Sequence, residues 1–437
     1  MTKNRLQEDQ LLVEESHDLP LVHFQVVIPS GSIEDPEGRE GLTRLTARLL
    51  RRGTTSRTTR EIEETIDALG AELSIETTPG FVRLSGSTIE RSLEPILALV
   101  GEILSSPSLP EDELGQLKRE TEAALLELTD SDQALAGMHF RRALFRGHPY
   151  GRPSLGTRAT LGRIDIDQVV ARYRTGLQPR PRLVGFAGAI SHARAEVLSR
   201  KYLLARREPP QPILLPPEPS MPKGRHLRIV DKPERTQTQI QIGRLASHPH
   251  DPDHVALLIG NAVFGGAFTA RLMRAVRSER GWSYGASSRV GLDRIREAWN
   301  MWTFPAATDA VACIALQLQL MEDWVANGID AQELAFAKGY MVKSHAFSVD
   351  TADKRLEQQV ETILYDLPAD YYSGFTKRVE AVTLEDVNES LATRLAPRDL
   401  VMSVVATESE IGPALRETLE LNTTEVVAYD ADAAETP

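Results

Sequence analysis

The sequence predicts an α+β protein of two homologous domains, each built on a mainly antiparallel sheet with helices packed on one face. Three observations support this fold class. The chain of 437 residues is too long for one ordinary core. A proline-rich stretch divides it near the middle, between Pro209 and Pro222. A shift of 218 positions aligns the segment before this stretch with the segment after it.

The internal repeat is visible as matched residues at a constant spacing. In each half an amphipathic helix is followed by a Pro-Arg turn and an apolar strand, at 183–187 in the first half and 400–405 in the second. Because chance matches rarely keep a constant spacing, we interpret the halves as copies of one domain. The matched pairs are Ile166 with Leu384, Val169 with Val387, Leu177 with Leu395, Pro179 with Pro397 and Arg180 with Arg398.

We expect four segments along the chain. Residues 1–208 form an N-terminal α+β domain, and residues 226–421 form a C-terminal one. The prolines of residues 209–225 forbid a continuing helix and predict an extended linker. Residues 422–437 are predicted to be a flexible acidic tail.

The first half begins with a predicted strand and two helices. Residues 21–30 alternate like a half-buried strand. Residues 40–52 place three leucines on one helical face before Gly53 ends the helix. Thr58 and Glu61 can then form a capping box at the start of a second helix.

A hairpin and two longer helices complete the predicted pattern. The segments 73–76 and 81–85 flank a Pro-Gly turn, which is typical of a hairpin. Apolar periodicity then predicts helices at 93–104 and 111–128. Strands followed by helices in each half are typical of sheets that carry their helices on one face.

Composition excludes several classes of function. The net charge of −12, from 50 basic and 62 acidic residues, disfavours a nucleic-acid partner, which needs clustered positive charge. We expect no membrane insertion, because no apolar run is long enough to span a bilayer. The single cysteine, Cys313, excludes an internal disulfide framework and a cysteine-rich metal site. The first residues lack a signal-peptide core, which predicts a cytoplasmic protein, or a periplasmic one if a leader has been removed.

One stretch of the second half is distinctive. A glycine pair opens a helix with the sequence GGAFTARL at 265–272, and this helix ends with VRSERGWSY at 276–284. The stretch resembles the second-domain signature of the pitrilysin/insulinase family of zinc peptidases, which includes mitochondrial processing peptidase. Ala267 departs from the signature, since many relatives have a third glycine there, and its side chain could stiffen the loop.

The resemblance implies roles for residues of this signature. In the family an arginine and a tyrosine seven positions later contact substrate in a catalytic chamber, and Arg277 and Tyr284 fit that spacing. Gly265, Gly266 and Phe268 are implied to bind substrate beside them. For either residue of the Arg/Tyr pair alone, a solvated arginine or a core-edge tyrosine is the simpler interpretation.

The resemblance extends over roughly residues 20–410. A second segment, FRGHPYGRP at 145–153 followed by LGT at 155–157, is similar to a family segment late in the first domain. Family members of this size consist of two homologous α+β domains, and two such chains close as half-shells around a chamber. The resemblance therefore implies that this chain forms one half-shell of a clamshell dimer.

The metal-binding motif of the family is replaced in this chain. The family's catalytic helix carries His-x-x-Glu-His, because residues four positions apart share one helical face and two imidazoles there can bind one zinc ion. Here Arg44 and Arg48 stand at the histidine positions and Ala47 stands at the catalytic glutamate. A guanidinium has no lone pair for a metal and alanine cannot act as a base. Glu127, seven positions after Glu120, resembles the third ligand and is interpreted as a remnant. We therefore expect no metal in this chain.

The arginines of this helix allow two interpretations. Arg44, Arg48 and Arg51 form a basic stripe, for which a solvated face is the simpler interpretation. The alternative is a patch that binds acidic groups of a substrate or partner.

Two other patterns suggest chemistry and have simpler explanations. A Gly-x-Ser-x-Gly sequence around Ser283 fits the nucleophile turn of hydrolases, but that turn follows a strand, whereas this one leaves a predicted helix. His248, His250 and His254 are close enough in sequence to suggest a metal cluster. An N-cap at Asp251 would leave only His254 on the following helix, so a loop-borne histidine pair is the favoured interpretation.

The sequence therefore predicts a non-catalytic subunit of a heterodimeric zinc-dependent peptidase. In this hypothesis a homologous partner that bears His-x-x-Glu-His holds the zinc ion, and this chain supplies Arg277 and Tyr284 as donors to the carbonyl and oxyanion of a peptide substrate. The alternative is a purely structural or binding subunit, similar to the core proteins of a respiratory complex. A third possibility, a self-sufficient hydrolase, depends on Ser283 alone.

Overall fold

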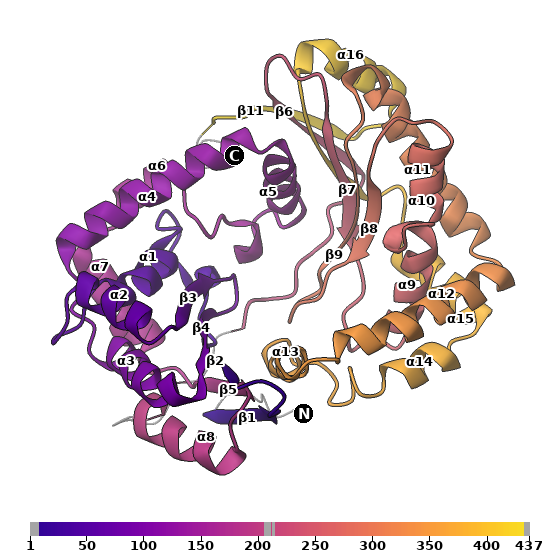
Figure 1. The fold of residues 1–437 in the computed structure, drawn as a ribbon. Helices are drawn as coiled ribbons and strands as arrows, with labels where there is room; N and C mark the ends of the chain where they lie inside the picture. The colour runs from indigo at the N-terminus through magenta and orange to yellow at the C-terminus, as the bar shows by residue number, and fades with distance from the viewer. Residues whose placement is uncertain (1–7, 205–210, 212–214, 432–437) are drawn as a thin grey trace.

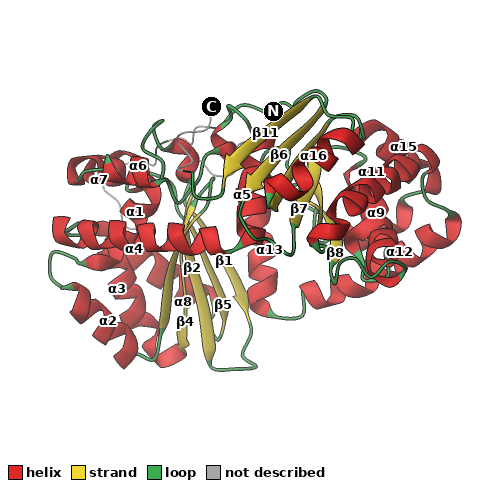
Figure 2. Ribbon diagram, turned by 90° about the horizontal axis from the view of Figure 1, so that it is seen from above, coloured by secondary structure: helices red, strands yellow, loops and turns green. Residues whose placement is uncertain are grey.

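Two sheets, one from each half of the chain, lie side by side with helices around them (Figure 1). The computed structural model describes residues 8–204, 211 and 215–431. Most helices lie on the outer sides of the two sheets (Figure 2). The strands are, in chain order, β1 (Gln10–Glu15), β2 (Leu21–Ile28), β3 (Glu72–Thr77), β4 (Val82–Ile89), β5 (Leu183–Gly188), β6 (Arg225–Asp231), β7 (Gln239–Leu245), β8 (Ala286–Val290), β9 (Ala298–Thr303), β10 (Leu400–Ala406) and β11 (Thr423–Ala428).

The helices divide in the same way between the two halves. Those of the first half are α1 (Leu42–Leu49), α2 (Thr59–Ala68), α3 (Leu93–Ser105), α4 (Glu111–Asp130), α5 (Asp132–Leu144), α6 (Arg158–Gly162), α7 (Ile166–Arg172) and α8 (His192–Leu198). Those of the second half are α9 (His254–Asn261), α10 (Arg271–Met273), α11 (Ala310–Asn327), α12 (Ala331–His345), α13 (Ala352–Leu364), α14 (Phe375–Ala381), α15 (Leu384–Arg394) and α16 (Glu408–Thr418).

The two sheets share one strand order, which confirms the predicted pair of homologous domains. The first sheet runs β1-β5-β2-β4-β3, and the second repeats this order as β6-β10-β7-β9-β8, with β11 added beside β6. The pairs β1·β5, β6·β10 and β6·β11 are parallel, and the other neighbours are antiparallel. The equivalent strands β2 and β7 begin 218 residues apart. The mainly antiparallel α+β fold is therefore confirmed.

Local signals in the sequence place several element boundaries well. The Thr58 side chain accepts a hydrogen bond from the backbone N–H of Glu61, whose carboxylate accepts one from the backbone N–H of Thr58. This capping box satisfies two donors at the start of α2. The helices predicted at 93–104 and 111–128 are α3 and α4, and each extends one or two residues further.

The prediction of a flexible tail at 422–437 is wrong for its first part. Thr423–Ala428 forms β11 and pairs in parallel with β6. Val427 is buried, and Glu425 forms an ion pair of 2.6 Å with Arg228. Four of the six residues of this strand are β-branched, and their preference for strands outweighs the acidic composition of the segment. The prediction for the last six residues falls outside the described part of the chain, as does part of the predicted linker at 209–225.

One helix from each half of the chain packs on the sheet of the other half. α5 packs on β6, β7 and β10 of the second sheet, and α13 packs on β1 and β5 of the first. The two helices begin 220 residues apart and are equivalent by position in the repeat. Both views show them between the sheets (Figures 1 and 2). The sequence predicted helices on one face of each sheet, and the exchanged helices cover the second face.

Buried apolar contacts hold the exchanged helices in place. On α13, Leu356 and Val360 join a buried cluster with Val27 and Leu183 of the first sheet. Gly185 on β5 permits this close packing, because a Cβ there would lie 3.0 Å from the Leu356 side chain. On the other side, buried residues of α5 and of the second sheet form a matching cluster: Leu135, Ala136, Val230, Val405 and Val427. Apolar burial of this kind is the main stabilising contribution to such an interface.

Polar contacts between the halves add specificity to the apolar ones. Arg141 pairs with Glu297 at 2.8 Å, and Asp132 pairs with Lys232 at 2.6 Å. Each pair joins α5 to the second half. Because both members of each pair are mostly removed from solvent, losing one member would leave a poorly solvated charge.

One stretch of the second half, His254–Ser278, is long and apolar enough to cross a membrane by length and composition alone. It runs from α9 to the turn after α10, and 72% of its most apolar window is buried inside the protein. Such burial is also what the core helix of a folded domain shows.

The exchange predicts that the two halves unfold together. Replacing the buried leucine in Leu356→Ala should lower the free energy of unfolding by about 2–5 kcal/mol, because it leaves a cavity between α13 and the first sheet. Fluorescence reports on the second half alone, since the chain's tryptophans are Trp282, Trp299, Trp302 and Trp324. In urea, fluorescence and circular dichroism should shift to the same new midpoint.

The matched control is Val197→Ala, which removes methyl groups from a side chain on α8 that is 63% exposed. It should change stability by no more than about 0.5 kcal/mol. Separate fluorescence and circular dichroism transitions in Leu356→Ala would show that the halves are not coupled.

Candidate functional site

The helix α1 begins on a buried carboxylate. Asp35 accepts hydrogen bonds from the backbone N–H groups of Gly41 at 3.0 Å and Thr43 at 2.9 Å, and from the Thr43 hydroxyl. Burial raises the pKa of Asp35 to about 6, although these hydrogen bonds oppose the rise. Gly41 adopts a φ of 95°, where a side chain would be strained. The direction of α1 is thereby fixed.

The three positions of the metal motif have distinct surroundings on α1. Ala47 is fully buried in the core of the first half. Arg48 donates a hydrogen bond of 2.8 Å to Glu120 on α4. Burial, and then the charge of Arg48, lower the pKa of Arg44. A carboxylate at Ala47 could therefore be accommodated only by rearranging the core.

Glu120 is held by two guanidinium groups. Besides Arg48, Arg52 donates to both carboxylate oxygens at 3.0 and 2.9 Å. Burial on its own would raise the pKa of Glu120. A hydrogen bond from Gln116 and the charges of Arg52 and Arg48 outweigh it and hold this pKa below its ordinary value. An Arg–Glu–Arg bridge thus joins α4 to Arg48, one of the two positions that the resemblance assigns to the histidines of the metal motif.

That Glu127 is a remnant of the third ligand stays a prediction, and the structure shows where this side chain lies. Glu127 lies exposed on α4 and has no ion-pair partner in the described part of the chain. The carboxylate that faces the former histidine positions is Glu120, one heptad earlier. The seven-residue spacing puts both on similar faces of α4, but only Glu120 lies opposite Arg48.

These residues do not fit a zinc ion. Arg44 and Arg48 offer no lone pair, and the oxygens of Glu120 already accept from guanidinium groups. Within residues 8–204, 211 and 215–431, no group of three or more His, Cys, Asp or Glu side chains is placed to hold a metal ion.

The Arg/Tyr pair of the second half forms a stacked surface cluster. The Arg277 guanidinium lies 4.3 Å from the centre of the Tyr284 ring and 5.3 Å from the centre of the Phe268 ring. Tyr284 is 77% exposed and Phe268 is 70% exposed. No carboxylate among the described residues pairs with Arg277. Arg277 itself is half-buried. The structure therefore brings together three side chains that the sequence singled out, with both aromatic side chains exposed.

The two glycines of the signature lie where another part of the chain approaches the backbone closely. Gly265 is buried, and a Cβ there would lie 2.5 Å from the Ser288 hydroxyl of β8. Gly266 is exposed, and a Cβ there would lie 2.9 Å from the Asn261 side chain. Close packing against β8 thus explains Gly265 without a ligand.

Ser283 is a structural residue. Its hydroxyl donates to the carbonyl oxygen of Gly285 at 2.6 Å and accepts from the backbone N–H of Phe304 at 3.0 Å. It is 3% exposed and lies in a loop that enters β8. The structure therefore agrees with rejecting Ser283 as a nucleophile.

The histidines near 250 also have structural partners. His254 is buried between the hydroxyl groups of Ser247 and Tyr371, and burial lowers its pKa to about 4. His248 and His250 stack on each other before the helix. The predicted helix start at Asp251 is wrong, because α9 begins at His254 after a turn. The loop-borne pair is otherwise as predicted.

The two candidate regions lie far apart within the chain. Figure 1 places α1 in the half opposite to α10. The replaced metal motif and the Arg277 cluster therefore do not form one site in a single chain. Sequence reasoning missed the contacts of Arg48 and Arg52 with Glu120, because spacing along one helix does not show which residues of two helices meet.

The Arg–Glu–Arg bridge should stabilise the fold in a pH-dependent way. Glu120→Gln should lower the free energy of unfolding by about 1 kcal/mol at pH 7, since it leaves Arg48 and Arg52 without their shared partner. The folded state lowers the pKa of Glu120, so its contribution is present above the ordinary value of 4.5 and is lost as the pH falls through the lowered pKa. Urea unfolding should therefore show that the free energies of unfolding of the unsubstituted chain and of Glu120→Gln become equal at acidic pH.

The control for this change is Glu127→Gln, seven residues along the same helix. It removes the same charge from an exposed side chain and should leave the free energy of unfolding unchanged both at pH 7 and at acidic pH. Equal effects of the two substitutions would contradict the role given to Glu120.

Comparisons with known proteins cover most of the chain. Residues 11–158 match the family described as "Insulinase (Peptidase family M16)". Residues 163–341 match the family described as "Peptidase M16 inactive domain". The boundary between the two matches falls inside the first structural half, before β5 closes the first sheet.

Relatives carry both peptidase and non-peptidase names. The chain is 19% identical over 408 residues to the non-peptidase homolog YmxG of Helicobacter pylori, with 92% of each chain covered. It is 22% identical to an uncharacterized zinc protease of Mycobacterium bovis, with 85% of each covered. It is 26% identical over 190 residues to the mitochondrial-processing peptidase subunit alpha of Neurospora crassa, covering 43% of this chain and 33% of that protein.

A solved structure shares the whole fold. The peptidase M16 inactive domain from Pseudomonas fluorescens superposes with a TM-score of 0.83 at 24% identity, covering 91% of this chain and 96% of the other. This likeness shows a shared fold, and the two family matches, which together span most of the described residues, show that the chain belongs to the M16 peptidase family.

Proposed function

We propose that this chain is a non-catalytic subunit of a heterodimeric zinc-dependent peptidase and lends Arg277 and Tyr284 to the zinc site of a partner M16 subunit. The observation that carries the proposal is the contrast between the two halves. On α1, Arg48 is paired with Glu120, whereas in the second half Arg277 stacks on two exposed rings, Phe268 and Tyr284, and has no acidic partner among the described residues.

The stacked geometry suits a role in holding a peptide. The rings of Phe268 and Tyr284 fix the plane of the Arg277 guanidinium while leaving its N–H donors for carbonyl oxygens. The exposed Tyr284 hydroxyl can donate to an oxyanion. Holding donors in place before the substrate arrives lowers the cost of binding.

The partner in this proposal is a homologous chain that bears His-x-x-Glu-His and alone holds the zinc ion and the general base. Two comparisons support a partnered, non-catalytic role: one relative is named a non-peptidase homolog, and another is named a subunit of a processing peptidase. A purely structural subunit is the alternative, and it has no need for exposed donors at Arg277 and Tyr284.

Mixing this chain with a His-x-x-Glu-His relative from the same source tests the proposal. The chain alone should be silent toward a quenched fluorescent peptide, and the mixture should show chelator-sensitive cleavage. In the mixture, Tyr284→Phe should lower turnover about a hundred- to a thousandfold, because one donor to the oxyanion is lost. Assembly, measured by sedimentation, should be unchanged.

The matched control is Tyr340→Phe, which removes a hydroxyl from another exposed tyrosine on α12. It should leave turnover and assembly unchanged. Unchanged turnover in Tyr284→Phe would remove the proposed role, and a mixture no faster than the relative alone would favour the structural subunit.

A further inference from the structure

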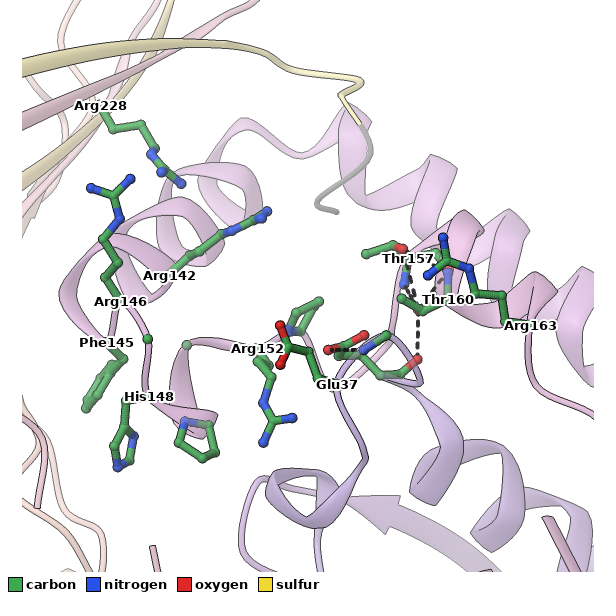
Figure 3. Close-up of a pocket in the computed structure, with 16 residues that line it drawn as sticks. Glu37, Arg142, Phe145, Arg146, His148, Arg152, Thr157, Thr160, Arg163 and Arg228 are labelled. Atoms are coloured by element: carbon green, nitrogen blue, oxygen red, sulfur yellow. Dashed lines mark hydrogen bonds between the residues drawn. The ribbon is translucent and has the colours of Figure 1, made fainter. Parts of the chain in front are cut away.

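A large cavity lies between the two halves of the chain. Its volume is about 810 Å³, within the range of small-molecule sites. It is lined by the end of α5, the segment from there to α6, the loop before α1, and one side chain of β6 (Figure 3). The arginines that line it are Arg142, Arg146, Arg152, Arg163 and Arg228.

The deepest of these arginines has unused hydrogen-bonding capacity. Arg228 on β6 is 4% exposed. Its Nε and Nη2 atoms donate to Glu425 of β11 at 3.0 and 2.6 Å. Its Nη1 atom is buried and has no partner. A buried donor without a partner costs free energy, which an acceptor in the cavity would recover.

The charge on the cavity wall is positive. Five arginines face two acids, Glu37 and Glu40. The Arg152 guanidinium donates to the backbone carbonyls of Asp35 and Ile33 at 2.8 and 2.9 Å, so these contacts leave its charge uncompensated. Arg163 is exposed and has no acidic partner in the described part of the chain.

The surroundings of the cavity show the same positive field. His139 on α5 is buried, and burial first, then the charges of Arg228 and Arg142, lower its pKa to about 3. An imidazolium is therefore unfavourable beside these guanidinium groups. A bound anion would relieve the same repulsion among the arginines.

We propose that this cavity binds a small polyanion, a molecule that carries two or more phosphate or carboxylate groups. Planar guanidinium forks match both of these oxyanions. The Nη1 atom of Arg228 donates a hydrogen bond to the buried end of the ligand, and Arg163 contributes positive charge at the exposed end. The proposal does not depend on the Arg277 cluster or on a peptidase partner.

The site also couples a ligand to the junction of the halves. Arg142 and Arg146 belong to the first half, whereas Arg228 belongs to the second. A ligand that contacts both sides would stabilise the docked arrangement of α5 on the second sheet. Ligand binding to the folded state alone raises the unfolding temperature.

Titration of the full chain with tripolyphosphate and with citrate tests the proposal. Calorimetry and thermal unfolding should be measured at an ionic strength held constant with sodium chloride. Saturable binding at one site per chain and a raised Tm are expected for at least one probe. A preference for tripolyphosphate identifies a phosphate-bearing ligand, and a preference for citrate identifies a polycarboxylate.

Substitutions locate the binding in the cavity. Arg228→Lys keeps the charge near Glu425 but loses the second arm of the fork, and should weaken binding by about tenfold. Arg163→Met changes an exposed side chain without risk to the fold, and should weaken binding several-fold. The matched control is Arg158→Met, which removes the same charge from the exposed start of α6 outside the cavity wall.

Each other outcome overturns the proposal. These outcomes are binding of neither probe, equal weakening by Arg158→Met and Arg163→Met, or an effect that sodium chloride reproduces at the same ionic strength. Binding of an acidic peptide with no binding of either small anion would also overturn it.

Discussion

The packing of α5 on the second sheet and of α13 on the first is the constraint on which the rest of the structure depends. Each sheet has an apolar face toward the middle of the molecule, and neither half covers its own. Because close-packed interfaces resist continuous deformation, the exchange fixes the halves relative to one another. It also fixes the cavity, since Arg142 reaches its wall from the end of α5. The two copies of the repeated domain are therefore held together by packing that neither copy provides alone.

Arginine side chains have different partners in the two homologous halves. In the first half, Arg48 and Arg52 both donate hydrogen bonds to Glu120. In the second, Arg277 rests on aromatic rings and keeps its donors free of acidic neighbours. The same kind of side chain thus forms an ion-pair bridge at one place and an aromatic stack at another. Neighbouring residues, rather than the arginine itself, decide between these outcomes.

Much of the fold follows from local and periodic signals. The 218-residue spacing predicts two similar sheets, and the Thr58–Glu61 pair marks a helix start. What the sequence cannot show is which sheet an apolar helix face will meet. The amphipathic pattern of α13 is satisfied equally by either sheet, and only the tertiary structure selects the first.

The candidate site shows the same division. Residue identity alone predicts that Arg44 and Arg48 cannot bind zinc, because this is a property of the guanidinium group. Which carboxylate of α4 contacts Arg48 depends on how α4 lies against α1, and no spacing rule determines that. The walls of the cavity are harder still to predict, since Arg228 and Arg163 are distant in sequence and line the same cavity from different halves.

The exchanged helices have a consequence for synthesis on the ribosome. The first sheet is complete once β5 has emerged, but its cover, α13, ends at Leu364 and is translated much later. At usual elongation rates the delay is on the order of ten seconds or more. During that interval the nascent chain presents an uncovered apolar sheet that includes Val27 and Leu183. Protection by a chaperone would therefore be most valuable midway through translation, before the second half can supply its helix.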